Sequence, residues 1–380
     1  SPSSAASDVY KRQGDLGPER AAKARGDPHA RRRPRPCGLT VHPGIGCPHG
    51  CLYCYVGDLL GGPSEPRPTQ LSGLEMAYAL AANPYFVPGI MGTFLALGAI
   101  CDPFYPSLVG RTLGIISAVQ TRLGNPIQFS TKIRLTADLV AELPRGGPIS
   151  PLITIVSLER ANELEPRAPP PEERLESISE LRRAGFKPFL FLRPLIPGLI
   201  ERELDDILSE AKAAGAVGVV VGSLRVSRLI LARLGKIGLD KPVLARLKRR
   251  PPLRKLVPVP SADLKQMALE AAEERGLIGL RAACCANALV AGVPCADLCW
   301  LRGFCTSCPN RCIEKLPPVD EELLSEALSL FGLKAKEISV GEHRISIRLG
   351  PNVDRPKLAV ARVPLEVATR RQISFIIGRR

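Results

Sequence analysis

The chain of 380 residues is long enough for one large domain with smaller additions. Apolar residues make up 45% of it, which is typical of a globular protein and excludes a wholly disordered chain. With 52 Lys and Arg against 37 Asp and Glu, the formal charge is +15, so a polyanionic partner is a candidate. No apolar segment typical of a secretory signal opens the sequence, and we therefore expect a cytoplasmic protein.

The N-terminal region, residues 1–36, is rich in Pro and Arg and has no apolar periodicity. It predicts a disordered basic tail. Residues 1–13 resemble translated adapter sequence rather than native protein, so we expect them to lie outside the fold.

From residue 38 on, short apolar runs alternate with amphipathic segments. The runs predict strands at 38–42, 93–99, 127–131, 152–157, 187–192 and 217–223. Helices with one apolar face are expected at 172–185 and 201–215. Apolar strands separated by helices indicate an α/β fold with a parallel sheet, here a partial (β/α)6 barrel over residues 37–280 that includes a basic linker. In such folds chemistry gathers at the C-terminal ends of the strands.

An uncharged run, residues 76–101, is long enough for a membrane span. Pro84, Pro88, Gly89 and Gly92 interrupt it. We therefore expect a buried helix, a turn and a strand in this region, and no membrane association.

The segment GIGCPHGCLYCYVGD places Cys47, Cys51 and Cys54 after the first predicted strand. Three thiolates can ligate three irons of a 4Fe-4S cluster and leave the fourth iron open to a substrate or cofactor. Structural zinc normally has four protein ligands. A zinc knuckle and three structural thiols are the alternatives.

The C-x3-C-x2-C spacing, with Tyr53 before the last cysteine, resembles the signature of the radical S-adenosylmethionine (radical SAM) superfamily. Residues 38 to about 232 resemble its spore photoproduct lyase-like (DNA repair photolyase-related) branch in CPHGCLYCYVG, CDPFYP, FSTK, LEPRAPPPEERL, LRRAGFKPFLFLRPLIPG and AGAVGVVVGSLR. The resemblance implies a 4Fe-4S cluster on the three cysteines, S-adenosylmethionine (SAM) on the open iron and an external one-electron donor. It also implies reductive cleavage of SAM to methionine and a 5'-deoxyadenosyl radical.

The resemblance further implies a SAM site at the strand ends. Tyr53 would pack beside the adenine, and Ser130 and Lys132, on one face of the third strand, would hold polar groups of SAM. Ordinary loop packing of Tyr53 and a solvated Lys132 are the alternatives. The further cofactor-binding candidates are Glu159, Glu165, Arg167 and Arg193. His49 is expected to be an ordinary polar loop residue.

Cys101 ends the second predicted strand. In spore photoproduct lyases a cysteine near this point returns a hydrogen atom to the product radical. Cys101 is offset from that place by two residues, which keeps the same strand face. A catalytic hydrogen donor and a small buried hydrophobe are therefore both open for Cys101.

Residues 281–315 hold a second group of cysteines: Cys284, Cys285, Cys295, Cys299, Cys305, Cys308 and Cys312. In a protein without an export signal they indicate metal rather than disulfides. Cys299, Cys305, Cys308 and Cys312 are the predicted ligands of an auxiliary iron-sulfur cluster or of zinc, because four thiolates suit either. Cys284 and Cys285 are too close to ligate one ion together, so at least one is structural or replaces Cys299.

The last segment, residues 316–380, predicts a small α+β domain. We expect a helix at 321–333 and strands within 338–350 and 357–367. Ile345, Ile347 and Leu349 alternate with polar residues, which indicates a half-buried strand.

These features lead to three hypotheses. The first is a radical SAM enzyme acting on DNA or RNA by lyase or modification chemistry, as in DNA repair, because the basic charge and the resemblance agree. The second is a radical SAM enzyme that modifies a peptide or protein with the help of an auxiliary cluster. The third is a non-catalytic, zinc-bearing nucleic-acid-binding protein.

Overall fold

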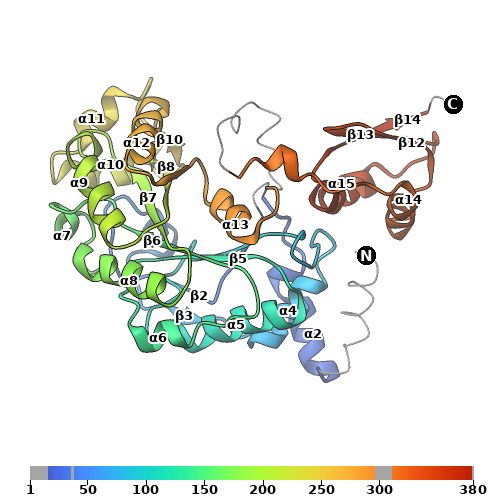
Figure 1. The fold of residues 1–380 in the computed structure, drawn as a ribbon, viewed down its shortest axis with the longest axis horizontal. Coiled ribbons are helices and arrows are strands. Elements are labelled where there is room, and N and C mark those ends of the chain that lie inside the picture. The colour runs from blue at the N-terminus through green and yellow to red at the C-terminus, as the bar shows by residue number, and fades with distance from the viewer. Residues whose placement is uncertain (1–15, 36–37, 296–309, 379–380) are drawn as a thin grey trace.

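The computed structural model describes residues 16–35, 38–295 and 310–378 (Figure 1). Its largest element is a seven-stranded sheet, parallel throughout, in the order β1-β4-β5-β6-β7-β8-β11. The strands are β1 (Leu39–Val41), β4 (Leu95–Leu97), β5 (Ile127–Thr131), β6 (Ile149–Thr154), β7 (Phe189–Leu195), β8 (Gly218–Ser223) and β11 (Ile278–Leu280). The six predicted strands are confirmed as β1 and β4 to β8, and the sheet does not close, in agreement with the predicted partial barrel.

Helices connect consecutive strands of this sheet, as parallel pairing requires. They are α4 (Gly73–Ala81), α5 (Val109–Arg122), α6 (Ala137–Ala141), α7 (Ala161–Leu164), α8 (Pro171–Arg183), α9 (Ile200–Ala213), α10 (Arg228–Gly235), α11 (Asp240–Ala245) and α12 (Ala262–Glu274). The main core lies between the sheet and the helices that include α4, α5, α8, α9 and α12. The structure also has two small antiparallel strand pairs. One pairs β2 (Gly44–Ile45) with β3 (Arg67–Pro68), and the other pairs β9 (Arg225–Val226) with β10 (Val257–Pro258).

Helix α13 (Ala283–Ala291) packs on the other face of the central strands. Leu152, Phe189 and Val220 point toward it, in one buried group with Cys285 and Ala286. Two residues anchor the helix: the Asn287 amide donates to Leu95 O at 3.3 Å, and the Ser150 hydroxyl donates to Ala286 O at 3.3 Å. In Figure 1 α13 lies between the sheet and the C-terminal elements.

The C-terminal elements form a three-stranded sheet with two helices. They are α14 (Glu321–Leu330), β12 (Ala335–Val340), β13 (Arg344–Leu349), α15 (Arg355–Thr369) and β14 (Gln372–Ile377). Ile345, Ile347 and Leu349 are fully buried, which confirms the predicted half-buried strand. The predicted strand at 357–367 is wrong, because this segment is α15, with Ala361 and Leu365 buried four residues apart on one face.

The N-terminal region also differs from the prediction. Residues 18–26 form α2 (Pro18–Gly26), followed by the short helix η2 (Pro28–Ala30), so the expectation of a disordered tail is wrong for residues 16–35. Ala21 and Ala24 are buried, and α2 packs mainly against α4. The small alanines gave too weak an apolar signal to predict this packing. Within the described residues, no helix has the length and apolar character that a membrane crossing needs.

Candidate active site

The three cysteines of the predicted cluster motif lie on one loop at the mouth of the sheet. The loop runs from β2 to the short helix α3 (Val56–Leu60). Cys54 N–H donates to Cys51 O at 3.0 Å, which curls the loop, and Leu52 N–H donates to Leu164 O at 2.8 Å, which fixes it to the end of α7. A sulfur of this loop, Cys54 Sγ, accepts the N–H of Val56 at 3.4 Å.

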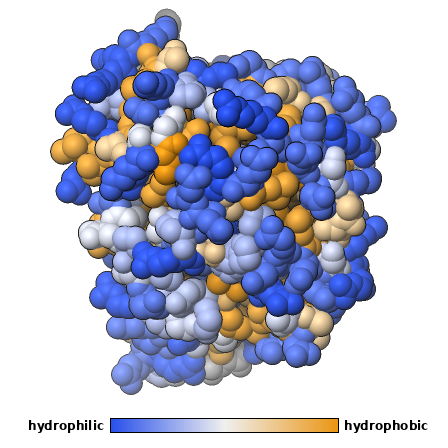
Figure 2. All heavy atoms as spheres, turned by 90° about the vertical axis from the view of Figure 1, so that its left-hand side faces the viewer, coloured by the Kyte–Doolittle hydropathy of each residue, from blue (hydrophilic) through white to orange (hydrophobic). Residues whose placement is uncertain are grey.

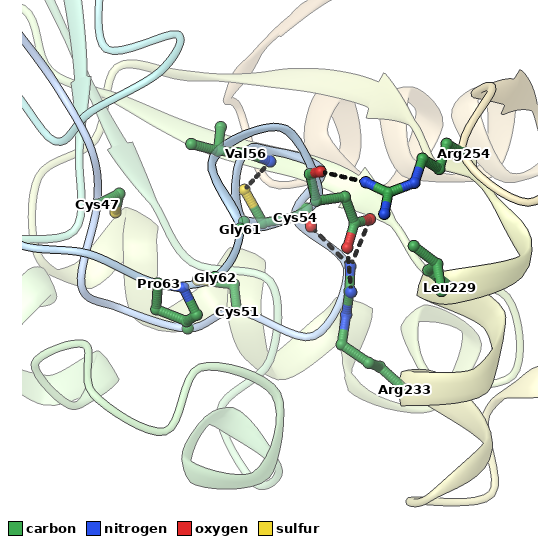
Figure 3. Close-up of a pocket in the computed structure, with 13 residues that line it drawn as sticks. Cys47, Cys51, Cys54, Val56, Gly61, Gly62, Pro63, Leu229, Arg233 and Arg254 are labelled. Carbon is green, nitrogen blue, oxygen red and sulfur yellow. Dashed lines mark hydrogen bonds and ion pairs between the residues drawn. The ribbon is translucent and has the colours of Figure 1, made fainter.

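Two neighbouring cavities share these three cysteines. The larger, of about 320 Å³, lies between the loop, α3 and α10 and is also lined by Arg233 and Arg254 (Figure 3). The smaller, of about 90 Å³, opens over the ends of β4, β5 and β6. Its lining includes Tyr53, Gly98, Cys101, Asp102, Ser130 and Lys132. The structure therefore brings together the three motif cysteines and four further predicted site residues around one space.

The thiols fit a cluster by their chemistry. Burial raises the pKa of Cys47 to about 11 and that of Cys51 to about 12, so at neutral pH their ionisation requires a bound cation. Within the described residues, no three His, Cys, Asp or Glu side chains are grouped to hold a single metal ion. Thiols spread around a shared cavity suit a cluster, whose iron atoms stand apart, better than one ion.

Glu165 is the centre of a buried charge network beside the loop. Its carboxylate accepts hydrogen bonds from the Tyr53 hydroxyl and from Arg174, and it lies 3.7 Å from Lys132 Nζ. Lys132 Nζ also lies over the Tyr53 ring, 5.6 Å from its centroid. Burial lowers the pKa of Lys132, but Cys51 and Glu165 outweigh this and raise it overall, so the ammonium stays charged. The solvated Lys132 that the sequence left open is therefore excluded.

Asp102 and His49 join the loop to the end of β4. Both side chains are buried, and His49 Nε2 lies 3.1 Å from Asp102 Oδ2. The same carboxylate accepts Thr131 Oγ1–H at 2.6 Å and Lys132 N–H at 2.8 Å. His49 is thus a structural contact of the loop, which corrects the expectation of an ordinary polar loop residue. The residues next to His49 in the sequence do not indicate this contact, because its partner Asp102 lies 53 residues away.

Arg233 of α10 fixes the other side of the loop. Its guanidinium donates to Leu52 O at 2.9 Å and to Cys54 O at 2.8 Å. It also pairs with both carboxylate oxygens of Asp58, at 2.5 and 3.1 Å (Figure 3). Sequence reasoning missed Arg233, which lies 179 residues from Cys54.

Four predicted cofactor-binding residues do not line the two cavities: the buried Glu165 described above, and three others. The side chains of Glu159, Arg167 and Arg193 are exposed. Glu159 contributes its N–H to a turn held by the buried Glu203, at 3.2 Å. Arg167 N–H donates to His49 O at 3.2 Å, and Arg193 packs its aliphatic stem beside Gly222.

Cys101 lies in the smaller cavity with the motif cysteines and Ser130. Burial raises its pKa to about 12, so its sulfur carries a hydrogen at neutral pH. The backbones of Gly98 and Ser130 pack closely at this end of the cavity. A side chain at position 98 would not fit, because its Cβ would stand 2.6 Å from Ser130 O. Gly98 has a φ of +100°, which favours glycine there.

The predicted auxiliary site lies mostly outside the described residues. This applies to Cys299, Cys305 and Cys308. Cys312 is described and is buried, as are Cys284, Cys285 and Cys295.

Residues 41–211 match the family model of the Radical SAM superfamily, so the chain contains a radical SAM domain. A radical SAM domain implies a 4Fe-4S cluster and SAM. Among curated proteins the chain is 30% identical over 205 residues to uncharacterized proteins of Mycobacterium tuberculosis and Mycobacterium bovis, covering 50% of this chain and 60% of each relative. It is 26% identical over 199 residues to an uncharacterized protein of Acidianus two-tailed virus, covering 48% of this chain and 64% of that protein. The chain thus spans about three fifths of the length of these relatives.

Among solved structures the fold is similar to that of spore photoproduct lyase. One variant of that enzyme, with bound AdoMet and dinucleoside spore photoproduct, aligns with a TM-score of 0.56 at 18% identity, covering 72% of this chain and 88% of the other. Another variant aligns with a TM-score of 0.54 at 18% identity, covering 70% of this chain and 85% of the other. This likeness confirms the predicted resemblance at the level of the fold.

The contacts of Arg233 predict a role in holding the loop. We expect Arg233→Gln to lower the free energy of unfolding by about 1–3 kcal/mol, because hydrogen bonds to a charged group are lost. The reconstituted variant should also lose its iron-sulfur absorbance to a chelator faster than the parent protein. Arg183→Gln is the matched control, since Arg183 is exposed and pairs with Glu180 on the same helix. Equal rates of iron loss in both variants would contradict the assigned role.

The ionisation of Asp102 predicts a pH dependence of stability. Burial by itself raises the pKa of Asp102, but the hydrogen bonds from His49, Lys132 N–H and Thr131 lower it overall. Its contribution to stability is therefore present above the ordinary Asp pKa of about 4 and is lost as pH falls through the lower folded-state pKa. We expect Asp102→Asn to destabilise the apoprotein by about 1.5–3 kcal/mol at pH 7 and by less at about pH 3, measured by urea unfolding. An equal loss at both pH values would argue against an ionised Asp102.

Proposed function

We propose that this protein is a radical SAM enzyme that cleaves SAM reductively and acts on a nucleic acid. The observation that carries the proposal is the shared cavity in which the three motif cysteines face Tyr53, Ser130 and Lys132 at the C-terminal edge of the parallel sheet. When bound there, the cluster and SAM would supply a one-electron cleavage that yields methionine and a 5'-deoxyadenosyl radical. The donor of that electron is an external protein or reductant.

The residues of the cavity have separate roles in this proposal. Cys47, Cys51 and Cys54 ligate the cluster, and the Tyr53 ring lines the adenine site. Ser130 and Lys132 bind polar groups of SAM, with Lys132 held in place by Glu165. Arg167 and Arg193, which are exposed, would contact the cofactor or substrate only from the rim of the site. The exposed carboxylate of Glu159 would likewise contact the cofactor or substrate from the rim of the site.

Cys101 is proposed as the hydrogen donor to a product radical. Its buried sulfur keeps its hydrogen, and it lines the cavity shared with the motif cysteines. Cys101→Ala should leave SAM cleavage intact and change the products formed from the substrate. The measurement is a comparison of substrate-derived products by mass spectrometry, with Cys285→Ala as a control at a buried thiol elsewhere in the fold.

A nucleic acid is proposed as substrate because basic residues line the larger cavity and are exposed on the segments next to it. Arg254 lines it, and Arg225, Arg228 and Lys255 are exposed on the neighbouring β9, α10 and β10 region. Figure 2 shows the side of the molecule that carries α9 to α11, and this side is largely hydrophilic. The similar spore photoproduct lyase structure contains a dinucleoside spore photoproduct, which supports the same substrate class.

The test combines binding with turnover. Anaerobically reconstituted protein, dithionite and SAM are incubated with deuterated DNA, RNA or peptide, and 5'-deoxyadenosine is analysed for deuterium. Deuterium from DNA or RNA, together with binding that weakens steeply as salt rises, is the expected result. Deuterium from the peptide alone would overturn the nucleic-acid substrate and favour a peptide-modifying enzyme. Zinc in place of iron and no 5'-deoxyadenosine would favour a non-catalytic binding protein.

A further inference from the structure

Basic side chains lie where three neighbouring strands of the parallel sheet end. The strands are β7, β8 and β11, which pair in this order. Arg193 lies near the end of β7, Arg225 follows β8 on β9, and Arg281 directly follows β11. Because neighbouring parallel strands end at the same edge of a sheet, the three arginines share one edge. The motif cysteines lie at the same edge, since their cavity opens over the ends of β4, β5 and β6.

Lys265 adds a further positive charge from the start of α12. This helix packs against β8 and β11. The residue after Lys265, Gln266, accepts a hydrogen bond from Arg281 Nη2 at 3.3 Å, which holds Arg281 beside the start of the helix. Lys265 is half-buried, whereas Arg281 is exposed.

The side chain of Arg193 reaches toward these two residues across β8. A Cβ at Gly222 of β8 would stand 2.5 Å from Arg193 Cδ, so the glycine leaves room for the arginine stem. The Arg193 guanidinium lies 6.0 Å from the centroid of the Phe191 ring, which projects from the same face of β7. Arg193 is thereby directed from β7 toward β11, the strand that Arg281 follows.

Arg193, Lys265 and Arg281 form one basic cluster. Burial lowers the pKa of Lys265, and the charges of Arg193 and Arg281 lower it further. Lys265 and Arg281 form no ion pair with a carboxylate of the described residues, and the nearby Asp263 pairs with Arg246 at 2.8 Å instead. The folded structure therefore disfavours the charged form of Lys265, so its ammonium weakens the fold at neutral pH.

Tyr55 places the basic cluster near the motif loop. Tyr55 directly follows Cys54, and its hydroxyl donates to Ala99 O, just after β4, at 3.2 Å. Burial and then Cys54 raise the pKa of Tyr55, whereas arginines that include Arg193 oppose the rise. Arg193 is therefore close enough to the Tyr55 hydroxyl to act on its ionisation.

Like charges that are held together without a counterion cost stability, whereas a polyanion would offset their repulsion. We propose that the basic cluster binds the phosphate backbone of a nucleic acid and positions it at the mouth of the sheet. This inference rests on the proposed function, because it assigns contacts to that substrate.

Arg225 would extend the bound backbone toward the larger cavity. Its guanidinium donates to Leu256 O at 3.4 Å, directly before β10. The same segment carries the exposed Lys255 and Arg254, which lines the larger cavity. The basic cluster and the residues of the larger cavity would therefore contact successive parts of one strand.

The first test measures binding by the full chain, reconstituted without oxygen. Fluorescence anisotropy follows labelled single-stranded DNA, and separately RNA of the same sequence, over a series of salt concentrations. Lys265→Gln and Arg281→Gln should each weaken binding about five- to tenfold at about 0.1 M salt. Each should also reduce the slope of log affinity against log salt by about 0.7 to 0.9.

Arg183→Gln is the matched control for net charge, since Arg183 is exposed on α8 and pairs with Glu180. It should bind like the parent protein. An unchanged slope in Lys265→Gln and Arg281→Gln, or an equal decrease in the control, would overturn the phosphate-binding role.

A second measurement separates this role from a structural one. Lys265→Gln should raise the urea midpoint of the apoprotein, because a half-buried charge and its repulsion are removed, although the same change weakens binding. A lower midpoint would show that Lys265 supports the fold and would overturn its assignment to phosphate.

Turnover with deuterated nucleic acid distinguishes this inference from the proposed function. If both variants lose affinity as expected but DNA and RNA supply no deuterium, the basic cluster stands and the proposed function fails. If nucleic acid supplies deuterium while both variants keep the affinity and salt slope of the parent, the proposed function stands and the basic cluster is overturned.

Discussion

Replacing Glu165 with Gln is expected to destabilise the protein by about 3–5 kcal/mol, because the substitution leaves buried cations without their anion. Glu165 and Arg174 are both fully buried and paired, and Lys132 is only 15% exposed beside them. The same change removes the acceptor of the Tyr53 hydroxyl, so the cluster loop loses a contact as well. Urea unfolding of the apoprotein at pH 7 measures the effect.

Two further variants make this prediction specific. Glu163→Gln, two residues away, removes an exposed carboxylate that pairs with Arg160 and should change stability little. The double variant Glu165→Leu, Arg174→Met should be less destabilised than Glu165→Leu alone, because it removes both charges of the pair. Equal unfolding free energies of Glu165→Gln and Glu163→Gln would show that the buried network does not stabilise the fold.

The second large effect is expected at the motif cysteines. The triple variant Cys47→Ala, Cys51→Ala, Cys54→Ala should make no 5'-deoxyadenosine from SAM and dithionite above the background without protein. Each cysteine is expected to be necessary, because a cluster that loses one of three protein ligands is no longer held securely. The product is quantified by liquid chromatography and mass spectrometry.

Product formation is the suitable readout here, because metal at the predicted auxiliary site would mask the loss of iron from the motif cysteines. Cys285→Ser is the matched control: its thiol is buried against the central strands and lines neither cavity. It should retain the activity of the parent protein. Undiminished 5'-deoxyadenosine in the triple variant would mean that the loop does not hold the catalytic cluster.

The sequence predicted those parts of the structure that depend on local patterns. The apolar runs predicted six strands of the sheet, and the cysteine spacing predicted a loop at its mouth. The seventh strand, β11, was missed because Ile278, Gly279 and Leu280 are too short a run to register. α15 was read as a strand because its apolar residues nearly fill the segment, and Pro364 within it disfavours a helix.

The contacts around the site depend on residues far apart in the chain, which local patterns do not reveal. Lys132 and Glu165 were both named as candidates, but their pairing at 3.7 Å and the buried Arg174 follow only from the packing of α8 against the sheet. Arg233 and Asp102 hold the loop from α10 and from the end of β4. Arg193 was placed at the mouth by its position after a strand, yet its side chain lines neither cavity.

The central claim is that Cys47, Cys51 and Cys54 hold a cluster with one iron open to SAM. Its most direct test is electron paramagnetic resonance and electron-nuclear double resonance of the dithionite-reduced protein with SAM labelled by ¹⁷O in the carboxylate. To exclude signals from the predicted auxiliary site, the sample carries Cys299→Ser, Cys305→Ser, Cys308→Ser and Cys312→Ser. We expect a 4Fe-4S signal that shifts on addition of SAM and shows a hyperfine coupling to ¹⁷O. A cluster signal that is unchanged by SAM and lacks this coupling would contradict the account.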